Sequence, residues 1–289
     1  MRHLKTSFSR FWKNPGLLSI LLLEFIFVVV FGILSYIVNT AVLFSLNTDV
    51  LASPLAATGE LNWRLLLNAK TIITLSLLFI VEFLLFVYLD SIFKSGFYTM
   101  VRNTIQDGNT KFGEFTPGVK RYSFAMLRLL LFRYSCIVLL AMPLVVGIVL
   151  GSAITFPSSY FQSLIVVSII IFLIGWFVIS LATLYAEFVI VFDDVSAIES
   201  IIKSSQLVKK HFFASLGSFL MIIFLVIAGI LAAKILQLPF SLLADRGVFY
   251  AAANQSMGFI LNIFTISATV IAGLYLCQRY HDITSHRKR

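Results

Sequence analysis

The chain has 289 residues, of which 60% are hydrophobic and only 12% are charged, and its mean hydropathy is +0.98. Ordinary soluble domains contain about 25% charged residues, so too few are present here to cover the outside of a water-soluble globule of this size. The composition therefore argues against a soluble enzyme, a disordered tail and a nucleic-acid-binding domain, and it favours a polytopic membrane protein.

Six apolar stretches follow one another along the chain. A helix needs about 20 mostly apolar residues to cross the hydrocarbon core of a bilayer. The stretches that meet this requirement are residues 17–44, 71–93, 129–151, 163–186, 212–233 and 256–277. Because they are continuous rather than alternating, they predict helices and not the strands of a barrel. The predicted fold class is all-α: one domain over residues 1–289, a polytopic integral membrane bundle of six transmembrane helices with short cytosolic amphipathic helices.

Basic residues are distributed unequally between the two sides of such a bundle. Of the 22 Lys and Arg residues, only Arg64, Lys70, Lys234 and Arg246 lie in segments on one side. Lys and Arg accumulate on the cytosolic side of membrane proteins, so we expect both termini in the cytosol and the protein in the cell membrane. The net charge of +9 then faces the anionic lipids of the inner leaflet. Lipid is the expected partner, a protein partner or a second copy is possible, and no nucleic acid is expected.

Three cytosolic segments have the pattern of interfacial amphipathic helices. Their apolar faces consist of Leu4, Phe8, Phe11 and Trp12 in the first segment, Phe97, Val101 and Ile105 in the second, and Val195, Ile198, Ile202 and Ser205 in the third. The second segment ends at Asp107-Gly108, where Gly suits a left-handed stop. Ser196 and Glu199 have the spacing of a capping box for the third. The segments recur about every 95 residues, which indicates either three repeated hairpin units or simply a six-helix chain with cytosolic ends.

Acidic and basic residues inside the predicted spans form the candidate polar cluster. An acid at the centre of a membrane helix costs about 2.5–3.5 kcal/mol, so such residues should face the bundle and find a partner. The cluster comprises Glu24, Glu82, Asp90, Glu187, Arg128 and Arg133. Two interpretations remain open: Glu24 and Glu82 pair with Arg128 or Arg133 and fix the packing, or they line a cytosol-facing cavity and carry protons or a cation.

The third span carries a second pattern, which concerns packing. Pro143 lacks a backbone N–H and should kink the helix. Gly147-x-x-x-Gly151 follows it, and this spacing allows helices to approach closely. Ala268-x-x-x-Ala272 in the last span predicts a similar contact strip. We assign these residues to helix packing.

No pattern in the sequence predicts catalysis. The four His residues lie outside the spans, and no H-E-x-x-H, Cys-x-x-Cys or P-loop sequence is present. We therefore predict no catalytic residue, no cofactor and no metal.

The fourth loop carries a resemblance to a known group of membrane domains. Glu187 near the end of the fourth span is followed by Asp194, Ala197-Ile198, Lys203-Ser204 and Leu207-Val208-Lys209. Elsewhere the matching positions are Asn14-Pro15, Gly96, Arg102, Asp107-Gly108 and Phe115. Together they resemble the membrane domain attached to some glycerophosphodiester phosphodiesterases and related uncharacterised bacterial and archaeal polytopic membrane families. Two departures are Ser205, where those families often carry Trp, and Lys210-His211, which replaces a small turn residue. The resemblance implies a fold and no activity, since the phosphodiesterase is a separate soluble domain.

Three functions are compatible with these observations. The leading hypothesis is a non-catalytic integral membrane protein that organises a partner complex or the inner membrane surface. The first alternative is a transporter or permease component for a small solute or lipid, with a cytosol-facing polar cavity. The second is an intramembrane lipid-modifying enzyme, which would need Asp90, Glu187, Asp193 and Asp194 to converge at headgroup depth.

Overall fold

The structure is a computed structural model, and it describes Ser9 and residues 13–46, 69–108, 110–153, 158–241 and 248–285. Every regular element within these residues is a helix, which confirms the all-α class for the part of the chain described. The first of the three predicted amphipathic segments, Leu4 to Trp12, lies outside these residues apart from Ser9.

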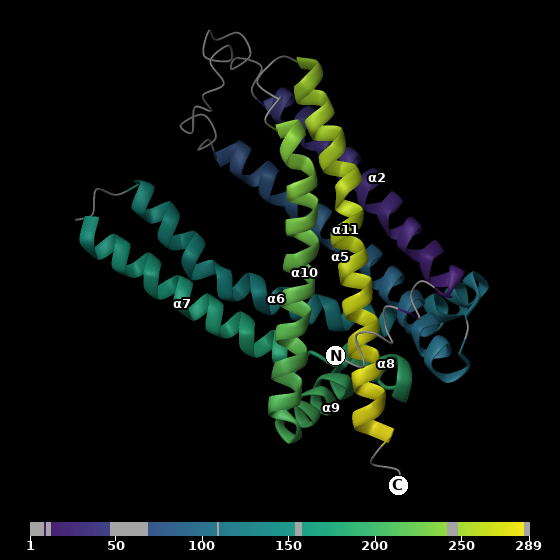
Figure 1. Ribbon diagram of the computed structural model, residues 1–289. Helices are drawn as coiled ribbons and strands as arrows, with labels where there is room; N and C mark the ends of the chain where they lie inside the picture. Colours follow the sequence, from purple (N-terminus) through teal and green to yellow (C-terminus); the bar gives the residue numbers. More distant parts are fainter. Residues whose placement is uncertain are drawn as a thin grey trace.

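Long helices make up most of the fold (Figure 1). The elements are α2 (Pro15–Leu46), α5 (Ala69–Gln106), the 3-10 turn η2 (Phe112–Glu114), α6 (Phe115–Ala153), α7 (Ser158–Ala182), α8 (Ala186–Asp193), α9 (Ala197–Lys210), α10 (Phe212–Ser241) and α11 (Val248–Ser285). Among the described residues, five segments are long and apolar enough to cross a membrane; they lie in α2, α5, α6, α10 and in α7 continued through α8. The predicted sixth span, residues 256–277, lies within the 38-residue helix α11. Such helices indicate a membrane protein, and the count of six stays a prediction.

The helices converge at one end of the molecule, which we call the base (Figure 1). The base comprises the second half of α5, the first half of α6, α8, α9 and the second half of α11. The buried hydrophobic core lies there; its largest members include Met100, Met126, Tyr185, Phe188, Leu274 and Tyr280. Beyond the base the hairpin of α6 and α7 leans away from that of α10 and α11 (Figure 1). Apolar side chains are exposed there, among them Leu139, Ile174 and Phe224, as expected of a surface whose solvent is lipid.

Two glycines bring α5 and α6 close together at the base. A Cβ atom on Gly96 would lie 2.3 Å from the Phe115 ring, and one on Gly118 would lie 2.4 Å from Oγ1 of Thr99. Gly147 is buried, and a Cβ atom there would lie 3.9 Å from a side-chain atom of Leu164 on α7, an ordinary van der Waals distance. The close helix approach predicted at this glycine stays a prediction.

The remaining packing predictions for the spans have mixed outcomes. In α10, a Cβ on Gly229 would lie 2.8 Å from that of Ala268, so the predicted strip on α11 does form a close contact. Helix α6 continues through Pro143 to Ala153, and Gly151 lies in its last turn. The kink at Pro143 and the helix contact at Gly151 stay predictions.

The second predicted amphipathic segment is not a separate surface helix. Residues 97–105 continue α5 without interruption, and Phe97 and Val101 are buried in the base rather than laid on a membrane surface. The apolar stripe was correctly identified, but it packs against protein, including α11 at Gly273. The stop is confirmed: Gly108 has φ +81°, in the left-handed region.

The third segment does form its own helix, α9. The hydroxyl of Ser196 accepts a hydrogen bond from the backbone N–H of Glu199, which confirms the predicted cap. The buried face consists of Ala197, Ser200, Ser204 and Val208, whereas Ile198 and Ile202 of the predicted stripe point outward. Small residues on the inner face allow α9 to lie close against the base.

A turn at residues 183–185 interrupts the fourth predicted span between α7 and α8. Such a break leaves backbone groups without helical partners, and they need hydrogen bonds when buried. The hydroxyl of Ser204 in α9 donates to the carbonyl of Ala182 at 2.7 Å and accepts from the N–H of Tyr185 at 3.1 Å. The guanidinium of Arg133 donates to the Thr183 carbonyl at 3.0 Å. The break is therefore stabilised by side chains from α9 and α6.

Candidate functional site

The centre of the polar cluster is the buried carboxylate of Glu187, in the first turn of α8. Its Oε1 accepts from Nη1 of Arg133 at 2.5 Å and from Nζ of Lys94 at 3.4 Å. Its Oε2 accepts from the hydroxyl of Tyr98 at 2.6 Å. Glu187 thus connects α8 to α6 and to two successive turns of α5.

Two further residues extend this network along α5 and α6. Nζ of Lys94 lies 3.1 Å from Oδ2 of Asp90, one helical turn away, and the hydroxyl of Tyr134 donates to the same oxygen at 3.2 Å. We call Asp90, Lys94, Tyr98, Arg133, Tyr134 and Glu187 the Glu187 network. Its two acids are matched by its two bases. A buried pair is tolerated only when its charges are compensated and its hydrogen bonds are made, and both conditions are met here.

Glu24 lies beside this network and not opposite an arginine. It borders a small cavity of about 50 Å³, together with Asp90, Lys94, Tyr98 and Thr269. That volume admits a water molecule. Glu24 is therefore an additional acid next to a set of charges that already balance.

Glu82 and Arg128 are placed elsewhere. Glu82 accepts hydrogen bonds from Ser35 and from Asn39 on α2, both at 3.0 Å. Arg128 is exposed, and its guanidinium carbon lies 4.2 Å from the centre of the Phe124 ring. The predicted pairing of Glu24 and Glu82 with Arg128 or Arg133 is therefore wrong, because Arg133 takes Glu187 as its acid. The residue count predicts how deep a side chain lies along a span. It does not predict which face of the helix carries that side chain.

Lys94, Tyr98 and Tyr134 were not predicted as site residues. The signal for two of them was present, since Lys94 follows Asp90 by four residues and Tyr98 follows Lys94 by four, so that all three share one face of a helix. Nothing in the sequence pairs Tyr134 with Asp90.

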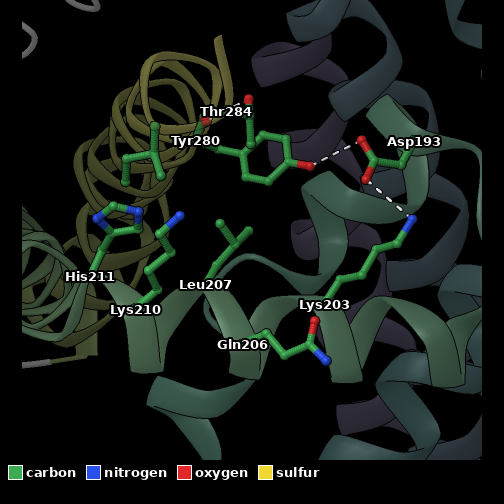
Figure 2. A pocket seen from close by; sticks show the side chains of 9 residues that line it. Asp193, Lys203, Gln206, Leu207, Lys210, His211, Tyr280 and Thr284 are labelled. Carbon is green, nitrogen blue, oxygen red and sulfur yellow. Dashed lines mark hydrogen bonds and ion pairs between the residues drawn. The ribbon is translucent and has the colours of Figure 1, made fainter. Parts of the chain in front are cut away.

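The base also contains an open cavity of about 440 Å³ (Figure 2). It lies between the end of α8, α9 and the end of α11. Side chains from α9 line it, with His211 at the junction to α10 and Tyr280 and Thr284 from α11. Asp193 sits at one end, where its carboxylate accepts from the Tyr280 hydroxyl at 3.1 Å and from Nζ of Lys203 at 3.5 Å. Burial and the nearby Asp193 charge raise the pKa of Tyr280, which therefore remains a hydrogen-bond donor.

Asp194 forms a third polar feature, at the turn between α8 and α9. Its backbone is left-handed, with φ 56°, and its carboxylate accepts two hydrogen bonds from the guanidinium of Arg121, one of them from Nε at 3.1 Å. These bonds lower the pKa of Asp194. The four acids needed by a lipid-modifying enzyme thus have different partners: Asp90 and Glu187 belong to the Glu187 network, Asp193 to the cavity and Asp194 to the turn.

Comparison with protein-family models, with curated proteins and with solved structures finds no significant match. The resemblance to the phosphodiesterase-linked membrane domains therefore stays a prediction. The fold defines the class at a coarser level: an all-helical protein with several helices of membrane-spanning length, joined at one end by a buried ion-pair network.

Proposed function

We propose that the protein is a non-catalytic integral membrane protein with six spans and cytosolic termini, and that its base organises the inner surface of the cell membrane. The observation that carries this proposal is the Glu187 network. Two acids and two bases compensate one another within hydrogen-bond distance, and they connect α5, α6 and α8. Groups bound to each other in this way stabilise a fixed base rather than a changing pathway.

The outside of the base supplies the second part of the proposal. Its exposed basic side chains include Lys111, Lys120, Arg128, Lys209 and Lys210. Each Lys or Arg close to an anionic leaflet contributes about 1 kcal/mol of attraction. Ile198 and Ile202 are exposed on α9 at the same end. A surface that combines basic and apolar side chains suits a layer of anionic headgroups.

Reconstitution into vesicles tests this function. Energy transfer from the protein's Trp residues to a labelled phosphatidylglycerol should exceed transfer to an equally labelled phosphatidylcholine, and the difference should shrink at high salt because surface charges are screened. Replacing Lys111, Lys120 and Arg128 with Gln should reduce the preference for phosphatidylglycerol. Replacing Lys234, on the far side of the predicted bundle, with Gln should leave that preference unchanged. Equal transfer to both lipids would contradict the proposal.

The cavity beside Glu24 favours a second candidate, a transporter component. Glu24 is the acid that the network does not balance, and it borders a space of about 50 Å³. A vesicle flux assay with Glu24→Gln distinguishes the two functions, with Glu82→Gln as a control that lies away from the cavity. Flux that is lost with Glu24→Gln and retained with Glu82→Gln would support transport; absence of flux in the unaltered protein would leave the organising role preferred.

A further inference from the structure

We propose that the cavity between α8, α9 and α11 binds a phosphate group, supplied by the headgroup of an anionic phospholipid or by a soluble phosphate ester. The cavity measures about 440 Å³, within the range of about 300–1,000 Å³ found for small-molecule sites. This inference deepens the proposed function, on which it rests, by giving the base one specific lipid site in addition to a general attraction.

One face of α9 provides most of the polar lining. Lys203, Gln206 and Lys210 lie three and four residues apart and therefore point to the same side of the helix. His211 follows directly at the junction with α10. Figure 2 shows the ammonium of Lys210 and the ring of His211 next to each other at one end of the cavity, with Lys203 and Asp193 at the other.

The charges at the two ends of the cavity differ. At one end the carboxylate of Asp193 accepts from Tyr280 and from Lys203, and Lys203 also lies 3.3 Å from Glu199. Lys203 is therefore already paired at that end, where two carboxylates face one ammonium. At the other end, the side chains of Lys210 and His211 make no hydrogen bond or ion pair with any residue that the structure describes. These two donors lack an acceptor, and a phosphate offers several acceptor oxygens together with negative charge.

The position of the cavity along the molecule favours a lipid as the source of the phosphate. His211 immediately precedes α10, whose membrane-length segment begins at Phe212. Phe212 and Phe213 are 44% and 86% exposed, as side chains that enter lipid would be. Lys210 and His211 therefore lie at the boundary of the apolar layer, where phospholipid phosphates are found.

Lys210 could act only by stabilising the C-terminal end of α9, and the experiment must distinguish that role from phosphate binding. Lys209 and Lys210 both lie in the last turn of α9, where basic residues stabilise the helix dipole. Lys209 shares that turn and is exposed, but it does not line the cavity. Lys209→Gln is therefore a matched control, because it removes the same charge from the same turn.

The test uses the full chain, purified in detergent and depleted of lipid. Native mass spectrometry with dioleoyl phosphatidylglycerol should show one lipid that remains bound at high salt, and dioleoylglycerol, which has the same chains and no phosphate, should not remain. The double variant Lys210→Gln, His211→Asn should lose about tenfold or more in affinity, as expected when charge-assisted hydrogen bonds are removed. Lys209→Gln should bind like the unaltered protein, and thermal unfolding should show that both variants are folded.

Competition identifies the source of the phosphate. If glycerol phosphate binds by calorimetry and displaces the lipid, the site takes phosphate from either source; if it does not bind, the site takes the lipid. Three results would each overturn the proposal. They are an equal loss of lipid affinity in Lys209→Gln and in the double variant, equal retention of dioleoylglycerol and phosphatidylglycerol, and no retained lipid at all. The proposed function is tested by the salt-sensitive preference for labelled phosphatidylglycerol, and the phosphate site is tested by the lipid that stays bound at high salt. The two proposals can therefore fail independently.

Discussion

Glu187 is the residue on which the arrangement of the base depends most. It accepts from Arg133, Lys94 and Tyr98, which come from two different helices. Its position at the start of α8 also places a negative charge near a helix N-terminus, which is favourable. Asp90, the other acid of the network, has two partners, Lys94 and Tyr134. The stability of the base should therefore respond more to Glu187 than to any other acidic residue.

Glu187→Gln should destabilise the protein strongly, because Arg133 and Lys94 would stay buried with Asp90 as their remaining acid. Breaking a buried ion pair from one side costs about 3–5 kcal/mol. The measurement is the midpoint of unfolding in detergent. Glu199→Gln, which removes an exposed partner of Lys203, is the control and should cost less than about 1 kcal/mol. Similar losses in both variants would show that the network does not stabilise the fold.

Asp194 gives the base a dependence on acid pH. Hydrogen bonds from Arg121 lower its pKa below the usual 3.8. A lowered pKa means that the stabilisation is complete above the unfolded value and is lost as the pH falls through the folded value. The unfolding midpoint should therefore fall more between pH 6 and pH 3 in the unaltered protein than in Asp194→Asn, by a small amount because the pair is exposed. Arg121→Gln should behave like Asp194→Asn; a fall as large as that of the unaltered protein would contradict the assignment.

At the scale of elements, length and apolar continuity were enough to locate the helices, and the cap at Ser196 and the stop at Gly108 followed from local chemistry. The sequence did not predict whether each helix face packs against lipid or against protein. The stripe of Phe97 and Val101 looks the same in sequence whether it meets lipid or α11, since both are apolar. The break at residues 183–185 was missed because its hydrogen bonds come from Ser204 and Arg133, which are distant in sequence.

The candidate site shows the same limit. Residue count placed Asp90, Glu187 and Arg133 at similar depths. In the structure Glu187 binds Arg133 directly and is joined to Asp90 through Lys94. Residue count gives no information on how each helix is rotated about its axis, so the partners assigned to Glu24 and Glu82 were wrong. Rotation is set by tertiary contacts, among them the close approach of α5 and α6 at Gly118.

Gly118→Ala tests that approach. The added methyl group would meet Thr99 at 2.4 Å from Oγ1 and 2.6 Å from Cβ, so α5 and α6 must separate, at a cost of about 1–3 kcal/mol. Gly147→Ala in the same helix is the control. Its added methyl group would make an ordinary contact with Leu164, 3.9 Å away, and replacing a helical Gly without a clash removes about 0.5–1 kcal/mol of unfavourable entropy. The first variant should melt lower than the unaltered protein and the second no lower; the reverse order would contradict this packing.

At the scale of the whole molecule, the hairpins converge at the base and lean apart beyond it (Figure 1). The apolar side chains on the outer parts of the helices are exposed, and burial in lipid would remove about 25 cal/mol per Å² of unfavourable contact with water. Adhesion between hairpins is therefore concentrated at one end. The surrounding bilayer supports the other end.

The six-span layout predicts the sides on which the termini lie. With reporter tags fused to each end of the full chain in inside-out vesicles, an added protease should remove both tags, and in right-side-out vesicles it should remove neither. A tag inserted after Ser53, in the first predicted outer loop, should behave oppositely. Termini on opposite sides would show an odd number of crossings and would contradict the six-span layout.

The order in which the network's members leave the ribosome has a consequence for biosynthesis. Arg133 is made 54 residues before Glu187, its acidic partner. Throughout that interval a nascent chain carries a cation near the membrane interior whose counter-charge has not yet been translated. Truncated chains that stop short of α8 should therefore be retained by the insertion machinery or degraded, whereas chains extended just past it should accumulate.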